Sequence, residues 1–316
     1  MTLSRQQCLF TEMEESITCP KPVNIASVPH RSPFRYPGGK TWFVPTFRNW
    51  IRSLQNKPSL LIEPFAGGGT ISLTALFEHA VEHVIMVELD EEIAAVWQTI
   101  VNGHADWLAK RILGFDLSKE NLLCELQKKD GDIKEKAFQT ILKNRTFHGG
   151  ILADGAGFLK NGENGKGIHS RWYPATLAKR FSNLERIAGN ITFLQEDGLN
   201  TITEYADYPD AIFFIDPPYT AGGKKAGKRL YRHFELDHDL LFKTCSLIRG
   251  NFLMTYDNAE EVRHKARTYG FQMRLISMNN THHATMEELV IGKDLSWMDS
   301  YPAVHEPEMS WSGEKT

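Results

Sequence analysis

The sequence predicts an α/β protein built on a seven-stranded, mostly parallel sheet of the Rossmann type, with one small insertion of helices and loops. Short apolar runs bounded by turn residues recur along the chain, as expected for buried parallel strands. Amphipathic segments typical of helices separate most of these runs. A glycine turn at residues 67–69 follows the first run and precedes a helical pattern, as at the start of a nucleotide-type βαβ unit.

The individual elements follow from periodicity and turn signals. Strands are expected at 59–63, 84–87, 191–194, 211–215 and 251–255, with a closing pair at 272–277 and 287–291. Helices are expected at about 40–55, 70–80, 90–111, 117–128, 133–144, 176–188, 236–249 and 258–268.

Domain boundaries follow from where this alternation stops. Residues 1–28 and 296–316 show no sustained pattern and are expected to form an N-terminal and a C-terminal tail. The glycine-rich stretch near 149–167 is too long for a plain connection inside a sheet domain. We therefore expect a catalytic domain formed by 29–97 and 186–295, interrupted by an inserted recognition domain at 98–185.

Composition narrows the class of protein. The chain is 41% hydrophobic and 24% charged, which is ordinary for a globular protein. No apolar run approaches the ~20 residues of a membrane helix, and no signal-peptide pattern opens the chain, so a cytoplasmic location is expected. The cysteines and histidines show no metal-binding spacing, and no metal is expected.

Charge is distributed unevenly along the chain. The formal net charge is −3, which by itself argues against a polyanionic partner. However, basic residues outnumber acidic ones between 143 and 186, and the segment 222–233 has five basic residues and no acidic one. Local basic clusters matter more than net charge for contact with nucleic acid.

The apolar run 211–215 is followed by Asp216-Pro217-Pro218-Tyr219. A strand here would carry these residues to its C-terminal end, where open α/β sheets build their sites. The prolines are rigid and lack two backbone donors. A carboxylate, free carbonyl groups and an aromatic ring suit a planar group with an amino edge.

Acidic residues lie at or just after the ends of the first three predicted strands. Glu63 with Gly67 and Gly69 forms an acid-x-x-x-Gly-x-Gly pattern that suits S-adenosylmethionine, whereas Ser72 stands where a dinucleotide fingerprint needs Gly or Ala. Glu88 follows Gly69 at the distance where an acid meets a ribose hydroxyl. Asp197 could bind the amino edge of a cofactor adenine.

Taken together and in this order, these motifs resemble those of the Dam-like, α-class DNA adenine methyltransferases. The motifs are Phe34-x-x-x-Gly-Gly-Lys40, Glu63-Pro64-Phe65-x-Gly-Gly-Gly, the acid after the second strand, Asp197, and Asp216-Pro217-Pro218-Tyr219. The resemblance covers roughly 31–97 and 186–293 and places the target-recognition domain at the insertion. It implies a methyltransferase sheet with an antiparallel last strand. Glu88 departs from the family's usual Asp, and Tyr36 from its usual Trp.

The resemblance implies transfer of a methyl group from S-adenosylmethionine to the exocyclic amine of a flipped adenine in a specific double-stranded DNA sequence. The implied catalytic residues are Asp216, Pro217, Pro218 and Tyr219. The implied cofactor-binding residues are Tyr36, Gly38, Gly39, Lys40, Phe65, Ala66, Gly67, Gly68, Gly69, Thr70, Glu88, Leu89, Asp197, Gly198 and Asp216. The DNA-binding candidates, chosen from the basic clusters, are Arg145, Lys160, Lys166, Arg171, Lys224, Lys225, Lys228 and Arg229.

Other functions remain open at this stage. Methylation of the cytosine amine uses a similar tetrapeptide, and a DNA-binding protein with a relic methyltransferase fold is conceivable. An RNA or protein-amide substrate and a nicotinamide oxidoreductase fit the motifs less well. A monomeric state is expected. The sequence does not determine whether a companion restriction endonuclease exists or which DNA sequence is recognised.

Overall fold

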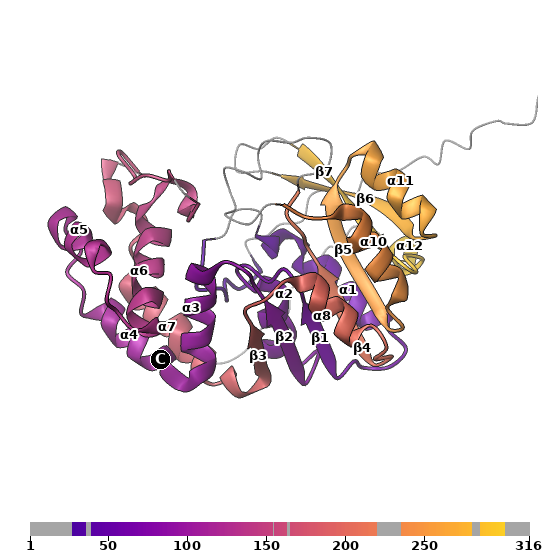
Figure 1. The fold of residues 1–316 in the computed structure, drawn as a ribbon, viewed down its shortest axis with the longest axis horizontal. Coiled ribbons are helices and arrows are strands. Elements are labelled where there is room, and N and C mark those ends of the chain that lie inside the picture. The colour runs from indigo at the N-terminus through magenta and orange to yellow at the C-terminus, as the bar shows by residue number, and fades with distance from the viewer. Residues whose placement is uncertain are drawn as a thin grey trace, which may run out of the picture.

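One seven-stranded sheet forms the centre of the protein, in the order β3-β2-β1-β4-β5-β7-β6 (Figure 1). The computed structural model describes residues 27–35, 39–153, 155–162, 165–219, 235–279 and 285–300, without the side chains of 278, 279, 285 and 286. The strands are β1 (Leu60–Glu63), β2 (His83–Val87), β3 (Ile191–Leu194), β4 (Ala211–Ile215), β5 (Asn251–Asp257), β6 (Gln272–Asn279) and β7 (Thr285–Gly292). β7 pairs antiparallel with both β5 and β6, and the other neighbouring strands pair in parallel, so the predicted fold class is confirmed.

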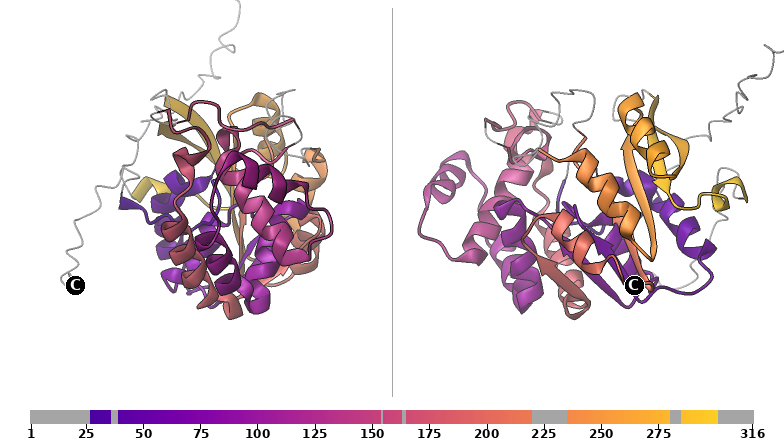
Figure 2. Two further views of the ribbon diagram at one scale, coloured as in Figure 1. Left: turned by 90° about the vertical axis from the view of Figure 1, so that its left-hand side faces the viewer. Right: turned by 45° about the vertical axis from the view of Figure 1, so that its right-hand side comes forward.

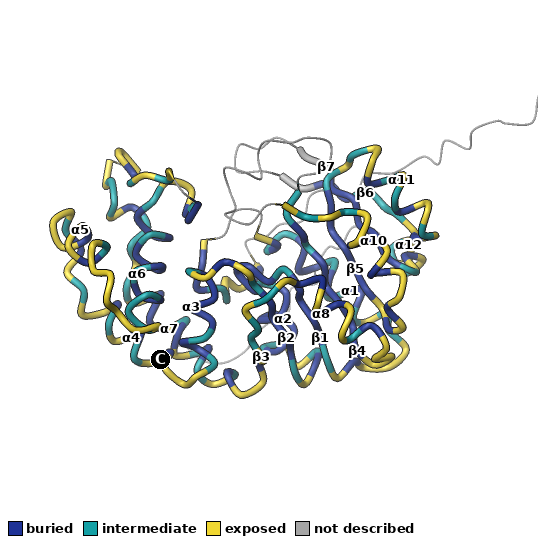
Figure 3. The backbone as a smooth tube through the Cα atoms, viewed as in Figure 1, coloured by how far each residue is buried: buried dark blue, intermediate teal, exposed yellow. Residues whose placement is uncertain are grey.

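The two faces of the sheet are covered by different helices. Successive residues of a strand point to opposite faces, so Leu61 and Phe214 join one apolar cluster while Ile62 and Phe213 join the other. Because both faces are covered, all five residues of β4 are buried and its sequence is continuously apolar. Figure 3 shows the strands as the buried centre of the molecule.

The first face is covered by helices from the N-terminal part of the chain. They are the 3₁₀ turn η2 (Lys40–Phe43), α1 (Val44–Ser53), α2 (Thr70–Phe77) and α3 (Glu91–Thr99). The second face is covered by α8 (Gly198–Tyr205), α10 (His238–Leu247) and α11 (Glu260–Thr268). Figure 2 shows the two layers from the side.

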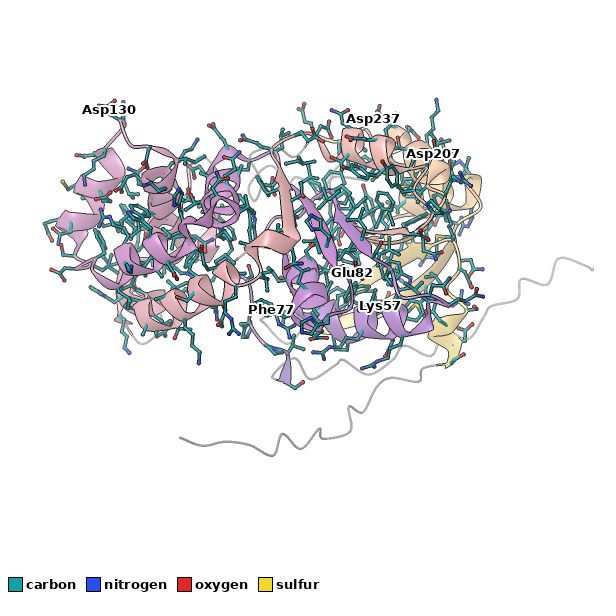
Figure 4. All side chains as sticks on the ribbon, turned by 90° about the horizontal axis from the view of Figure 1, so that it is seen from below. Lys57, Phe77, Glu82, Asp130, Asp207 and Asp237 are labelled. Atoms are coloured by element: carbon teal, nitrogen blue, oxygen red, sulfur yellow. The ribbon has the colours of Figure 1, made fainter. Side chains whose placement is uncertain are left out.

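The inserted region 98–185, for which a recognition role is expected, forms a helical lobe beside the β3 edge of the sheet (Figure 1). It contains α4 (Ala105–Leu113), α5 (Lys119–Gln127), α6 (Ile133–Thr146), the 3₁₀ turns η4 (His148–Gly150) and η6 (Gly167–Arg171), and α7 (Pro174–Glu185). Asp130, between α5 and α6, lies at one edge of the lobe (Figure 4). Most buried apolar residues of the lobe belong to the same cluster as the first face of the sheet, so lobe and sheet share one core.

Three element predictions were wrong in detail. The helix expected at 90–111 is broken at the π-helical segment η3 (Ile100–His104), where Gly103 has φ +75°. Helix α8 was not expected, and the 3₁₀ turn η7 (Ala188–Asn190) precedes β3. Part of the expected C-terminal tail forms α12 (Trp297–Ser300), whose first two residues pack against the core.

Candidate active site

The site lies where the strand order reverses. The chain runs from β1 outward to β2 and β3, and then returns to place β4 on the other side of β1. Ligands of open α/β sheets bind at such a switch point, beyond the carboxyl ends of the strands. Since β1 and β4 are hydrogen-bonded neighbours, the turn after Glu63 and the motif after Ile215 emerge side by side.

The turn after β1 is held by close packing. Gly67 and Gly69 both have positive φ, at 47° and 63°. The positive φ at Gly69 favours glycine, and a Cβ there would also lie 3.0 Å from the indole ring of Trp97. Trp97 of α3 donates from its indole N–H to the carbonyl of Gly67 at 2.9 Å. Gly68 and Ala66 are buried, whereas Phe65 and Thr70 are partly exposed.

Glu88 connects this turn to the end of β2. Its carboxylate accepts hydrogen bonds from the backbone N–H of Gly67 at 3.0 Å and of Asp90 at 2.9 Å. Burial, with a smaller effect of the Asp90 charge, raises the pKa of Glu88 to about 7. The neighbouring Leu89 is 42% exposed, which places an apolar side chain beside the carboxylate at this edge of the sheet.

Asp197 lies at the corresponding end of β3. Its side chain caps α8 by accepting from the N–H of Leu199 at 2.9 Å, and the residue is exposed. Gly198 is packed so tightly against the first turn that a Cβ would lie 2.2 Å from the carbonyl oxygen of Pro64. Because β2 and β3 are parallel neighbours, Glu88 and Asp197 follow adjacent strand ends.

Asp216 is surrounded by donors that reach one of its two oxygens. The hydroxyls of Tyr219 and Thr255 each donate to Oδ1 at 2.8 Å. The ammonium of Lys40 lies 3.0 Å from the same oxygen. No hydrogen bond from a described residue reaches Oδ2, or the carbonyl oxygen of the buried Pro217. The motif therefore presents acceptors whose orientation is fixed from one side.

Lys40 is buried, with 4% of its surface exposed. Its ammonium lies 2.9 Å from the Tyr219 hydroxyl and 3.3 Å from Oε2 of Glu288, in addition to Asp216. Burial acts to lower the pKa of Lys40, but the carboxylates of Asp216 and Glu288 outweigh it and raise that pKa. The ring of Tyr219 stacks on Tyr256, with 5.5 Å between ring centres and 23° between planes.

The family is established by comparison with known proteins. The model of the D12 class N6 adenine-specific DNA methyltransferases matches residues 36–278. The chain belongs to this family. It is an adenine-specific DNA methyltransferase, and its methyl donor is S-adenosylmethionine. The prediction of a Dam-like adenine methyltransferase is thereby confirmed, and adenine rather than cytosine is the base methylated.

Similarity to individual proteins is weak. Comparison with curated proteins finds no match. The rRNA methyltransferase aviRa from Streptomyces viridochromogenes is 11% identical with a TM-score of 0.37, covering 80% of this chain and 84% of that one. An S-adenosylmethionine-dependent methyltransferase from Agrobacterium tumefaciens is 13% identical with a TM-score of 0.35, covering 80% of this chain and 61% of that one.

The D12 methyltransferase has residues that fit the methyl donor at the ends of β1, β2 and β3. The carboxylates of Glu88 and Asp197 can accept hydrogen bonds from the hydroxyl and amino groups of an adenosine, and Leu89, which follows Glu88 in the chain, is an exposed apolar side chain. Gly39 is exposed at the start of η2, whereas Tyr36 and Gly38 lie outside the described residues. Among the described residues no cluster of side chains could hold a metal ion, and no helix could span a membrane.

The DNA-binding candidates occupy different environments. Lys160 and Lys166 are exposed and Arg171 is partly exposed. Arg145 is only 5% exposed and donates to the carbonyl of Pro33, so its guanidinium is not at the surface where a phosphate contact was expected. Burial, with the charges of three other arginines, lowers its pKa to about 9. The loop with Lys224, Lys225, Lys228 and Arg229 lies outside the described residues.

Three residues of the site were missed. Thr255 and Tyr256 lie near the end of β5, next to β4, and Glu288 lies on β7. Polar residues at the end of a predicted strand were a usable signal for Thr255, because parallel neighbours end at the same edge of the sheet. Glu288 gave no such signal, because it stands beside a second glutamate, Glu287, in the same strand.

Proposed function

We propose that this methyltransferase modifies the exocyclic amine of an adenine that is flipped out of duplex DNA at a specific sequence. The observation that carries the proposal is the arrangement of Asp216, where three donors meet Oδ1 and none from the described residues meets Oδ2. An amine has two hydrogens to donate. Oδ2 and the carbonyl of Pro217 are two acceptors that the same rigid turn presents.

Recognition of the amine requires the base to leave the helix. Flipping costs a few kcal/mol, and stacking on the ring of Tyr219 would return ~1–3 kcal/mol. Tyr219 suits this role because its hydroxyl is fixed by Asp216 and its ring is supported by Tyr256. The ring would then hold the base while the two acceptors orient its amine.

When Oδ2 of Asp216 and the carbonyl of Pro217 accept both hydrogens of the amine, the lone pair of the nitrogen is less conjugated with the adenine ring and points out of the plane of the base. When bound, S-adenosylmethionine would supply an electrophilic methyl group. The lone pair of the amine would form the new N–C bond as the bond from this methyl group to the sulfonium sulfur breaks, and the sulfur would leave as the thioether of S-adenosylhomocysteine. Asp216 stabilises the positive charge that develops on the amine and is placed to accept the proton that the nitrogen then loses. Positioning and charge stabilisation are the contributions of the protein.

The methyl donor would be held by the residues at three strand ends. We assign the ribose hydroxyls to Glu88, the adenine amino group to Asp197 and the turn 65–70 to close backbone contact. The exposed Lys160 and Lys166, with the basic loop 220–233, would bind backbone phosphates. We also propose that the enzyme acts as a monomer and that an endonuclease cutting the same sequence is a candidate partner.

Incubation with plasmid DNA and labelled S-adenosylmethionine tests the proposal. The wild-type enzyme should label adenine N6 within one short sequence, identified by mapping modified bases. Asp216→Ala should reduce labelling at least ~10²-fold, because charge stabilisation at the amine is lost. Label in RNA or protein with none in DNA would contradict the proposal, and labelling only of denatured plasmid would contradict its duplex substrate.

A further inference from the structure

Glu288 is a second carboxylate inside the site, and none of the motifs identified in the sequence includes it. It lies on β7 and is 8% exposed. Its Oε2 lies 3.0 Å from the Tyr219 hydroxyl and 3.3 Å from the Lys40 ammonium. Thus Glu288 contacts two of the three side chains that donate to Asp216.

Strand register explains why Glu288 reaches the site. β7 pairs with β5 in antiparallel register, which sets Glu288 opposite Asp257, two residues beyond Thr255. The preceding residue, Glu287, points to the other side of the strand, is exposed, and lies 3.4 Å from the Asn258 amide. One of two adjacent glutamates is therefore inside the site and the other is outside it.

The donors available in this group are shared between the two carboxylates. The Tyr219 hydroxyl has a single hydrogen, with acceptor oxygens of Asp216 and Glu288 at 2.8 and 3.0 Å. The Lys40 ammonium lies at 3.0 and 3.3 Å from the same two oxygens. For both the hydroxyl and the ammonium, Oδ1 of Asp216 is the closer acceptor, and Glu288 restrains each group through a second contact.

We propose that Glu288 is a positioning residue for methyl transfer, which holds the Lys40 ammonium and the Tyr219 hydroxyl on Oδ1 of Asp216 and so reserves Oδ2 for the substrate amine. The inference rests on the proposed function, in which Oδ2 receives the amine. When Glu288 is neutralised, Asp216 remains as the charged partner of Lys40 within this group. The ammonium can then shift toward both oxygens of Asp216 and compete with the amine for Oδ2.

The test compares Glu288→Gln with Glu287→Gln. Both replace one glutamate by its neutral isostere on the same strand, but only the first is inside the site. For Glu288→Gln, kcat should fall about 10²-fold, the size expected for a small misplacement of a catalytic group. The KM values for DNA and S-adenosylmethionine should change less than about threefold, because neither ligand is bound by Glu288. Glu287→Gln should match wild type.

A double-variant cycle separates positioning from a merely structural role. Tyr219→Phe keeps the ring and removes the hydroxyl through which Glu288 acts in part. The double variant Tyr219→Phe with Glu288→Gln should lose less activity than the product of the two single losses. A full product, an unchanged kcat for Glu288→Gln, or a rise in KM alone would overturn the proposal.

Two further measurements keep the outcome decisive. If Glu288→Gln does not fold, as judged by thermal unfolding, Glu288→Asp takes its place; it keeps the charge but withdraws it by one methylene, and kcat should fall at least about tenfold. An unchanged kcat for Glu288→Asp would then overturn the proposal. If wild type and Glu287→Gln do not label DNA adenine, the proposed function itself fails, whereas equal labelling by all variants defeats only the role of Glu288.

Discussion

At the scale of single residues, Glu63 links the stability of the fold to pH. It is 3% exposed and accepts from the N–H of Ser72 at 3.0 Å. Burial raises its pKa to about 8, against 4.5 for the exposed group. Between these values the folded protein binds a proton that the unfolded chain does not bind. The contribution of Glu63 to stability is therefore full below pH 4.5 and is lost as pH rises through about 8.

Glu63→Gln should remove this dependence, since the amide oxygen can still accept from Ser72. The wild-type protein should lose up to roughly 1.4 kcal/mol of unfolding free energy per pH unit between about pH 5 and 7.5 through this group. Denaturant titrations at several pH values should show a flatter curve for the variant and a more stable variant at about pH 8. Glu82→Gln, at an exposed position at the opposite end of the strands (Figure 4), should keep the wild-type slope.

Gly198, which follows β3, lies close to the turn after β1, and a substitution there tests this close packing. A Cβ here would lie 2.2 Å from the Pro64 carbonyl oxygen, so Gly198→Ala must push the two loops apart. Overpacking of this kind costs ~1–3 kcal/mol, and affinity for S-adenosylmethionine should fall because Asp197 moves with its neighbour. Calorimetric titration and thermal unfolding measure the two effects. Gly189→Ala, which has no atom within 4 Å of its Cβ, is the matched control and should change neither.

The role of a residue could be predicted only where the residue belongs to a recognisable sequence motif. Asp216 and Tyr219 follow a recognisable strand, and the structure brings them together at 2.8 Å. Lys40 was expected beside the cofactor, but its ammonium contacts the motif that follows β4. Glu288 contacts Lys40, which lies near the other end of the sequence. A contact between two such distant positions produces no local pattern in a single sequence.

At the scale of elements, the break between α3 and α4 shows where local patterns fail. The apolar periodicity of 90–111 favours one helix, but Gly103 adopts positive φ and α4 starts anew at Ala105. The N–H of Ala105 is capped at 2.8 Å by the carboxylate of Glu185, at the end of α7. The cap comes from eighty residues later in the chain, so no local signal marks the start of α4. By contrast, Asp197 caps α8 locally and was a signal that could have been used.

Glu185→Ala should therefore weaken the recognition lobe. Loss of a helix cap costs ~1 kcal/mol, and the N–H of Ala105 is left without its carboxylate partner. Hydrogen exchange should increase first in α4 and α7, and the unfolding midpoint should fall. Glu204→Ala, on the exposed side of α8, should stay within about 0.5 kcal/mol of wild type. Equal effects of the two substitutions would contradict the role of the cap.

At the scale of the whole molecule, the sheet was predictable because its strands are buried on both faces and read as continuous apolar runs. The sequence of a single strand does not determine its place in the sheet. The family resemblance nevertheless implied the antiparallel last strand, which the structure contains. The boundary of the region expected to act in recognition is harder to predict from the sequence, because the apolar residues of this region pack into the core on the first face of the sheet.

The distribution of charge along the chain predicts how DNA binding depends on salt concentration. With a net charge of −3, the protein needs local basic segments to bind DNA, and 222–233 holds five basic residues without an acidic one. Replacing Lys224, Lys225, Lys228 and Arg229 with Gln should reduce the slope of log affinity against log salt. Each phosphate that is no longer neutralised should lower that slope by ~0.9, since fewer counterions are released on binding.

Lys57 provides the control for this effect. It is exposed at the opposite end of the strands from the active site (Figure 4), so Lys57→Gln should leave the salt slope unchanged. Fluorescence anisotropy with a labelled duplex between about 50 and 200 mM salt measures both variants. An unchanged slope for the fourfold variant would show that the loop does not contact phosphates, and binding would then depend on the exposed lysines of the recognition lobe. Lys160→Gln with Lys166→Gln would in that case flatten the slope instead.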